Sequence, residues 1–171
     1  MTTTSTLPPL LGLGGVKLPV RDLEVTARWY TRILGWIRVT EFPDATGTVV
    51  GLAGRLPGRL HNSGLAFRLN PAAQAQEGLE LTLVVDARSD LEQWSEHLDR
   101  EGVGHSPIID ATTCWLLVLH DPDGHEIHLF TREEHGIDQT GRPGYGRRVP
   151  GVNLSPNDDW PTTKSAEGLT P

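Results

Sequence analysis

Apolar and polar residues alternate over short stretches of this chain, and helical spacing appears between those stretches. Val16, Leu18 and Val20 alternate within residues 12–20, which predicts a half-buried strand. Asp22 then has the character of a helix N-cap, and Gly35 of a helix end. The stretch between them predicts a helix, because its apolar residues share one helical face: Leu23, Ala27, Tyr30 and Leu34. Three more strands are expected at residues 36–42, 48–53 and 65–69.

The same order then begins again. Leu81, Leu83 and Val85 alternate, and a helix ending at Gly102 follows. Strands are expected after it at residues 105–111, 114–120 and 126–130. Leu18 and Val20 recur as Leu83 and Val85, at an offset of 65 residues in both cases. An internal repeat of this kind predicts two similar units, each with the order strand, helix, strand, strand, strand.

The flanking segments differ in composition from the repeats. We expect a flexible N-terminus at residues 1–11, module one at 12–70, a linker, and module two at 79–132. Residues 133–171 are polar and rich in Pro and Gly, which indicates an extended arm or a disordered tail. An arm could wrap a partner subunit through Tyr145 and Trp160, and a mobile tail is the alternative.

The phrase DPDGHEIHLF at residues 121–130 predicts the turn of a β-hairpin, with Pro122 and Gly124 as turn residues. If Asp121 faces Gly124, then His120 faces His125 and Leu119 faces Glu126. In the same register Leu117 faces His128. This register would put Glu126, His128 and Phe130 on one face of the sheet, together with Trp115, Leu117 and Leu119.

The composition and charge of the chain argue against several classes of protein. The net charge of −7 opposes a general nucleic-acid binder, whose affinity comes from clustered Lys and Arg. No apolar run has the length of a membrane span, and the N-terminus lacks the pattern of a signal peptide, so a cytoplasmic protein is expected. The single Cys114 lies in an apolar strand and is expected to be a buried small hydrophobe.

Two βαβββ units, the helix phrase DLEVTARWYTRILGW and the closing phrase DPDGHEIHLF together resemble the vicinal oxygen chelate superfamily. This group comprises glyoxalases, bleomycin-resistance proteins and extradiol dioxygenases. The resemblance covers residues 12–132 and implies an α+β fold. It implies two βαβββ modules in tandem that form a curved mixed sheet around a cavity, with the helices outside. Fold alone does not choose among the metal-dependent lyases, isomerases, dioxygenases and binding proteins of this group.

The resemblance also implies where metal ligands would lie, on the first and last strands of the modules. In this chain those four positions hold Gly15, Ala66, Glu80 and His128. Two of them cannot bind metal, and the other two carry a Glu and a His in exchanged places. A divalent ion at Glu80 and His128 would therefore have an incomplete ligand set and be weakly held.

Strand alternation predicts which residues face the cavity. Two carry positive charge, Lys17 and Arg68, and the alternative for both is a solvated strand end. The others that we expect to contact substrate are Thr82, Trp115, Leu117 and Phe130. Apolar walls with a few convergent polar groups are typical of a ligand site, although a Trp such as Trp115 is more often part of a core than of a ligand platform.

Glu80 and His128 are the candidate catalytic pair. A carboxylate beside an imidazole orients its tautomer, and such a pair can act as general acid and base. A structural ion pair is the alternative. Two functions stay open: an enzyme acting on a small anionic or enolisable compound, and a non-catalytic drug- or metabolite-binding protein. A homodimer is expected in either case from the resemblance.

Overall fold

The computed structural model describes residues 13–58, 63–75, 78–111 and 114–137 of the 171-residue chain. The chain divides into two compact units, one ending at Gln74 and the other beginning at Ala75. The expected flexible N-terminus at residues 1–11 lies outside the described residues, as do residues 138–171 of the arm expected at 133–171. Neither described helix is long and apolar enough to cross a membrane.

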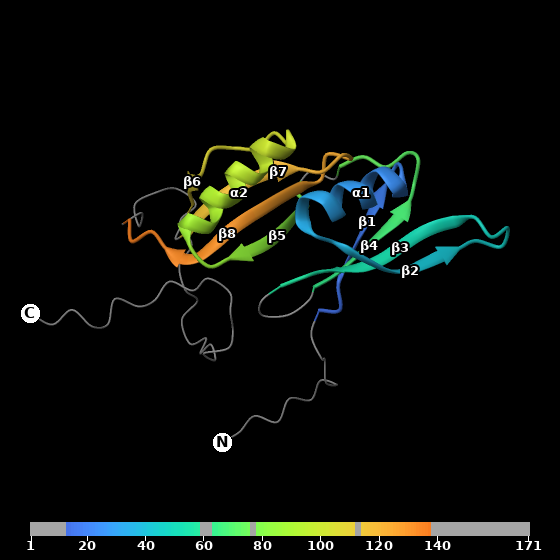
Figure 1. Cartoon of the computed structure of the whole chain (residues 1–171). Coiled ribbons are helices and arrows are strands. Elements are labelled where there is room, and N and C mark those ends of the chain that lie inside the picture. Colours follow the sequence, from blue (N-terminus) through green and yellow to red (C-terminus); the bar gives the residue numbers. More distant parts are fainter. Residues whose placement is uncertain (1–12, 59–62, 76–77, 112–113, 138–171) are drawn as a thin grey trace, which may run out of the picture. The chain divides into compact units, whose positions relative to one another are not determined.

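Unit one is a four-stranded mixed sheet with one helix (Figure 1). Its elements are β1 (Val16–Val20), α1 (Leu23–Leu34), β2 (Ile37–Pro43), β3 (Val49–Leu56) and β4 (Ser63–Leu69). The strand order is β1-β4-β3-β2. β1 pairs with β4 in parallel, while β4, β3 and β2 pair antiparallel.

Unit two has the same order of elements and the same sheet topology. Its elements are β5 (Glu80–Val85), α2 (Arg88–Glu101), β6 (Ile109–Asp110), β7 (Cys114–His120) and β8 (Glu126–Glu134). The strand order is β5-β8-β7-β6, with β5 and β8 parallel. The two tandem βαβββ modules that the repeat predicted are therefore confirmed. The last strand, expected at residues 126–130, runs to Glu134, two residues past the expected end of module two at 132.

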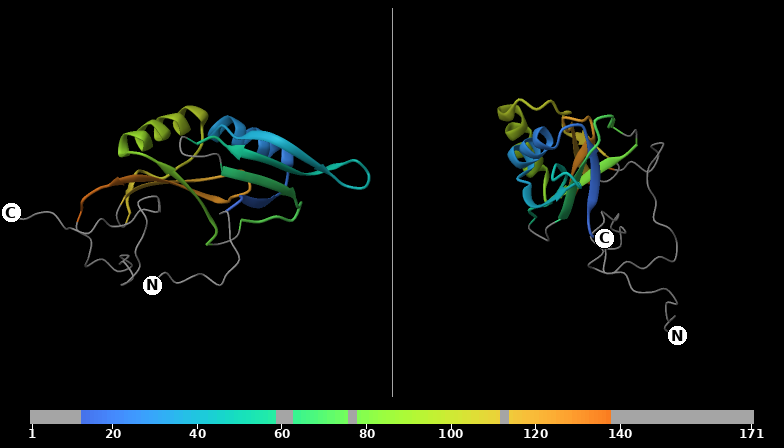
Figure 2. Two further views of the ribbon diagram at one scale, coloured as in Figure 1. Left: turned by 90° about the horizontal axis from the view of Figure 1, so that it is seen from below. Right: turned by 90° about the vertical axis from the view of Figure 1, so that its right-hand side faces the viewer.

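Each helix covers one face of its own sheet (Figure 2). In unit one the core between helix and sheet is aromatic: the ring centroids of Tyr30 and Phe67 lie 4.9 Å apart, and those of Trp36 and Phe67 lie 5.0 Å apart. The indole nitrogen of buried Trp36 donates to the Leu65 carbonyl at 3.0 Å, so its polar group is satisfied inside the core. In unit two the core is aliphatic and includes Leu91, Leu98, Leu119 and Ile127.

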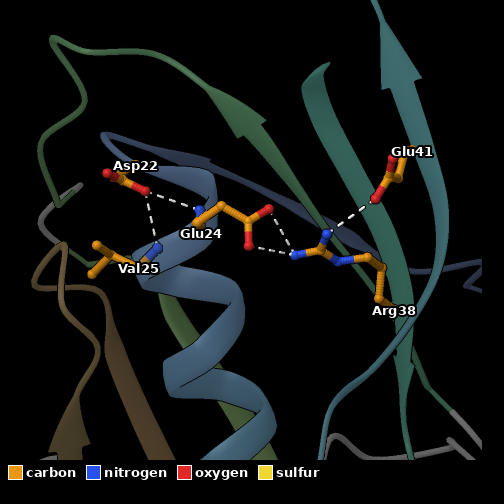
Figure 3. Close-up of polar contacts among 5 residues, drawn as sticks. All are labelled: Asp22, Glu24, Val25, Arg38 and Glu41. Atoms are coloured by element: carbon orange, nitrogen blue, oxygen red, sulfur yellow. Dashed lines mark hydrogen bonds and ion pairs between the residues drawn. The ribbon is translucent and has the colours of Figure 1, made fainter. Parts of the chain in front are cut away.

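Polar contacts fix α1 at its first turn (Figure 3). Asp22 caps the helix, because its carboxylate accepts from the backbone nitrogens of Glu24 and Val25 at 2.9 Å. The guanidinium of Arg38 on β2 then reaches both carboxylate oxygens of Glu24 at 2.9 Å and Glu41 at 3.0 Å. The hydrogen bond to Glu24 is the main reason that the pKa of Arg38 is raised. The Arg38–Glu24 ion pair ties α1 to the edge strand β2, while the Arg38–Glu41 pair lies within β2.

The register expected for the β7–β8 hairpin was wrong by one residue. Asp121 faces His125 rather than Gly124: its backbone nitrogen donates to the His125 carbonyl at 3.0 Å. The Asp121 side chain supports this arrangement by accepting from the backbone nitrogens of Asp123 at 2.9 Å and His125 at 2.8 Å. The loop thus holds three residues and ends at Gly124 with φ of 90°. Three-residue hairpin loops commonly have such a left-handed last residue.

The shifted register changes which face β7 presents. Leu117 lies opposite Leu129, and Val118 lies opposite His128. Leu117 is fully buried, as are Leu119 and Ile127, so these residues belong to the α2 side of the sheet. The expectation that Leu117 shares a wall with His128 was therefore wrong. On β7 the neighbour of His128 on its own face is Val118.

The register predicts different costs for truncating two adjacent residues. Leu117→Ala should lower the free energy of unfolding by about 2–5 kcal/mol, because it opens a cavity in the core of unit two. Val118→Ala, on the half-buried opposite face, should cost clearly less. Urea unfolding followed by circular dichroism measures both. Equal costs, or a larger cost at Val118, would contradict the observed register.

Candidate functional site

The candidate site lies on the face of the unit-two sheet that is turned away from α2. β5 and β8 are parallel neighbours, with Glu80 opposite Glu126 and Thr82 opposite His128. On β8 the alternate residues Ile127 and Leu129 are buried against α2, whereas Glu126 and His128 are half-buried. Strand alternation therefore puts the polar side chains of both strands on the open face.

Two carboxylates bracket the imidazole of His128. Its Nδ1 lies 3.2 Å from Oε2 of Glu80, and its Nε2 lies 2.5 Å from Oε1 of Glu126. The second oxygen of Glu126 lies 3.8 Å from Nε2 of His120. His120 was expected to face His125, but the one-residue shift puts it opposite Glu126 and makes this contact possible. The structure thus brings Glu80 and His128 together, as strand alternation predicted.

Glu126 was not among the residues selected from the sequence. The sequence could have indicated Glu126, because residues two apart on a strand share a face and Glu126 precedes His128 by two. Glu80, Glu126 and His128 each offer one ligand atom, and these atoms all lie within 4.8 Å of one another. Carboxylates and imidazoles are ligand types that suit borderline ions such as Zn²⁺ or Mn²⁺.

Thr82 and Phe130 lie on the same face as His128. Thr82 is exposed and opposite His128, whereas Phe130 is buried, with 7% of its surface exposed, and lies opposite Val84. Strand alternation predicted this face for both side chains. Their role in binding stays a prediction.

Trp115 lies elsewhere. The guanidinium carbon of Arg88, the first residue of α2, sits 4.9 Å from the centroid of its ring, and the His135 ring lies 5.5 Å away. A register shift between Cys114 and Leu116 accompanies this placement. The expectation that Trp115 shares a wall with His128 was wrong, because its side chain packs at the first turn of α2.

Cys114 is buried, as the sequence predicted. Burial raises the pKa of its thiol, so the thiolate is disfavoured. A thiolate is the reactive form of cysteine. Cys114 therefore has the character of a structural residue rather than a nucleophile.

Lys17 and Arg68 belong to unit one, on the face of its sheet turned away from α1. Lys17 lies opposite Ala66 on β4, and Arg68 lies opposite Gly51 on β3. A Cβ added at Gly51 would lie 3.6 Å from Nη1 of Arg68, so the absent side chain leaves room for the guanidinium. Both cations are exposed.

The ligand positions that the resemblance assigns to module one hold no donor. At Gly15 there is a steric reason: an added Cβ would lie 2.7 Å from the carbonyl oxygen of Gly64 on the neighbouring strand. A histidine could not occupy this position without moving the backbone. The polar groups that could hold an ion are thus those of unit two, among the residues that the structure describes.

The chain belongs to the superfamily of glyoxalases, bleomycin-resistance proteins and dioxygenases, whose family model matches residues 12–129. No protein of curated function matches it. Among solved structures, it is similar to a glyoxylase/bleomycin resistance protein/dioxygenase domain from Frankia sp. EAN1pec. That likeness has 27% identity and a TM-score of 0.62, and it covers 75% of this chain and 96% of the other.

Two structures with named activities share the fold at lower identity. One is the fosfomycin resistance protein FosX from Listeria monocytogenes, crystallised as a mutant with Mn(II) and 1S,2S-dihydroxypropylphosphonic acid. It has 16% identity and a TM-score of 0.59, covering 71% of this chain and 93% of that one. The other is lactoylglutathione lyase from Agrobacterium tumefaciens. It has 14% identity and a TM-score of 0.56, covering 72% of this chain and 96% of that one.

Proposed function

We propose that the protein is a small-molecule enzyme of lyase, isomerase or dioxygenase-like type, with Glu80 and His128 as its acid–base pair. The observation that carries this proposal is the 3.2 Å approach of Glu80 Oε2 to His128 Nδ1, from two adjacent strands, on the face opposite α2. A proton donor and acceptor at this distance can move a proton to or from a bound compound. An anionic or enolisable organic compound is the substrate class.

The contacts to substrate that we propose are fewer than the sequence indicated. Thr82 and Phe130 line the open face of unit two beside His128. Lys17 and Arg68 are proposed as anion-binding residues of the open face of unit one. Trp115 and Leu117 are no longer included, because both pack on the α2 side of their sheet.

A weakly held divalent ion is part of the proposal. Two ligand atoms that each bind one ion at about 2.0–2.2 Å lie roughly 3.0–3.5 Å apart at ordinary coordination angles. The 3.2 Å between Glu80 and His128 fits this separation. Such an ion, when bound, would polarise an oxygen of the substrate as a Lewis acid. The protein's own residues would still orient the compound and carry the proton.

The alternative is a non-catalytic drug- or metabolite-binding protein. The absence of donors at Gly15 and Ala66 favours it, because a catalytic ion normally has more protein ligands than Glu80 and His128 provide. The Glu80–His128 pair would then recognise a polar group of the ligand without transferring a proton.

A homodimer and a cytoplasmic location stay part of the proposal. The edge strand β2 exposes three large apolar side chains, Ile37 (43%), Val39 (65%) and Phe42 (44%), which a second copy could cover. Light scattering at micromolar concentration should give twice the chain mass of 18.7 kDa. A monomer would contradict the dimer and leave the proposed chemistry untouched.

Substitution of the pair tests the function. We expect Glu80→Gln and His128→Ala each to lower turnover by about 100-fold or more, since general acid–base catalysis contributes that much. The melting temperature should change little, because both groups lie on the open face. Fosfomycin and S-lactoylglutathione, each with and without Mn²⁺, are the first probes of a panel of small organic anions. Turnover is followed by NMR, and binding by calorimetry.

The matched control is Glu96→Gln, which removes the same charge from the exposed face of α2. It should leave turnover and binding unchanged. Binding without turnover that both site variants abolish would support the alternative function. Loss of stability with intact ligand binding would show instead that the pair is only structural, and would contradict both functions.

A further inference from the structure

His128 makes two different contacts with its flanking carboxylates. The contact from Nε2 to Glu126 Oε1, at 2.5 Å, is shorter than a usual N–H···O hydrogen bond and is too short for two ligands of one ion. The 3.2 Å distance from Nδ1 to Glu80 Oε2 is that of an ion pair and also suits two ligands of one ion. Nε2 of the His128 ring is therefore bonded to Glu126, whereas Nδ1 is the nitrogen that could bind an ion.

A neutral imidazole carries one N–H, and the partner of each nitrogen decides where that hydrogen lies. When Nε2–H donates to Glu126, the lone pair of the ring lies on Nδ1, which is 3.2 Å from Oε2 of Glu80. Two acceptors 3.2 Å apart repel each other, and a cation that contacts both, either a proton or a metal ion, would relieve the repulsion. The geometry therefore favours a cation between Nδ1 of His128 and the carboxylate of Glu80.

We propose that Glu126 is a positioning residue that holds His128 as the Nε2–H tautomer and so directs a divalent ion to Nδ1 and Glu80. This inference rests on the proposed function, because it concerns the same site. It adds a residue that lies outside the four ligand positions implied by the family resemblance. Metal-bound histidines generally donate their second N–H to a carboxylate or carbonyl, which orients the ring and strengthens the ligand.

Two features of the fold hold Glu126 in this role. Glu126 and His128 are two residues apart on the same strand, so backbone pairing with β5 and β7 fixes their separation. His120, opposite Glu126 on β7, lies 3.8 Å from the other carboxylate oxygen. His120 and His128 thus contact different oxygens of the Glu126 carboxylate.

The test uses the full chain, Zn²⁺ and long-range ¹H–¹⁵N NMR of the histidine rings, with no substrate present. The His128 signals are assigned by their loss in His128→Ala. We expect Zn²⁺ to shift Nδ1 of His128, while Nε2 keeps its hydrogen. Glu126→Gln should weaken Zn²⁺ binding by about 10–100-fold, as loss of such an outer partner does, and should mix the two tautomers. Glu96→Gln is the control and should change neither.

The opposite results would overturn the inference. They are a Zn²⁺-dependent shift at Nε2, a wild-type chain that binds no Zn²⁺ at millimolar concentration, or a Glu126→Gln variant with unchanged affinity and spectra. The readouts are independent of turnover. A chain with zinc at Nδ1 but no activity on any probe would contradict the enzyme proposal alone, and an active chain with zinc at Nε2 would contradict the positioning role alone.

Discussion

The parallel pairing of β5 with β8 is the constraint on which the candidate site depends. It joins the first and last strands of the second module and sets Glu80 opposite Glu126 and Thr82 opposite His128. The alternate residues on β8 are buried against α2, so a slip by one residue would bury the charged groups and expose the core. The energy of the apolar core therefore fixes the register, and the register brings the carboxylates to the imidazole.

The modules could be predicted because their signals are local and repeated. Alternation at Leu18 and Leu83 and the left-handed ends at Gly35 and Gly102 follow from side-chain burial and backbone freedom, which a sequence shows directly. The meeting of Glu80 and His128 could be predicted for the same reason. Glu80 and His128 each alternate along their strand with apolar residues that face α2.

The hairpin register could not be predicted from the phrase DPDG. A two-residue and a three-residue loop both suit Pro122 and Gly124, and the difference lies in contacts that only folding reveals. The Asp121 carboxylate accepts two backbone N–H groups and lies 2.9 Å from Nδ1 of His125, which makes the longer loop the stable one. That single residue moved Leu117 into the core and brought His120 to Glu126.

The central claim is that Glu80 and His128 act as one unit, and a double-mutant cycle on Zn²⁺ affinity tests it most directly. The cycle compares the wild type, Glu80→Gln, His128→Gln and the double variant. Residues that share an ion should show a coupling energy of about 0.5–3 kcal/mol. Losses that add within about 0.3–0.5 kcal/mol would show that the two residues act independently, which would contradict the claim.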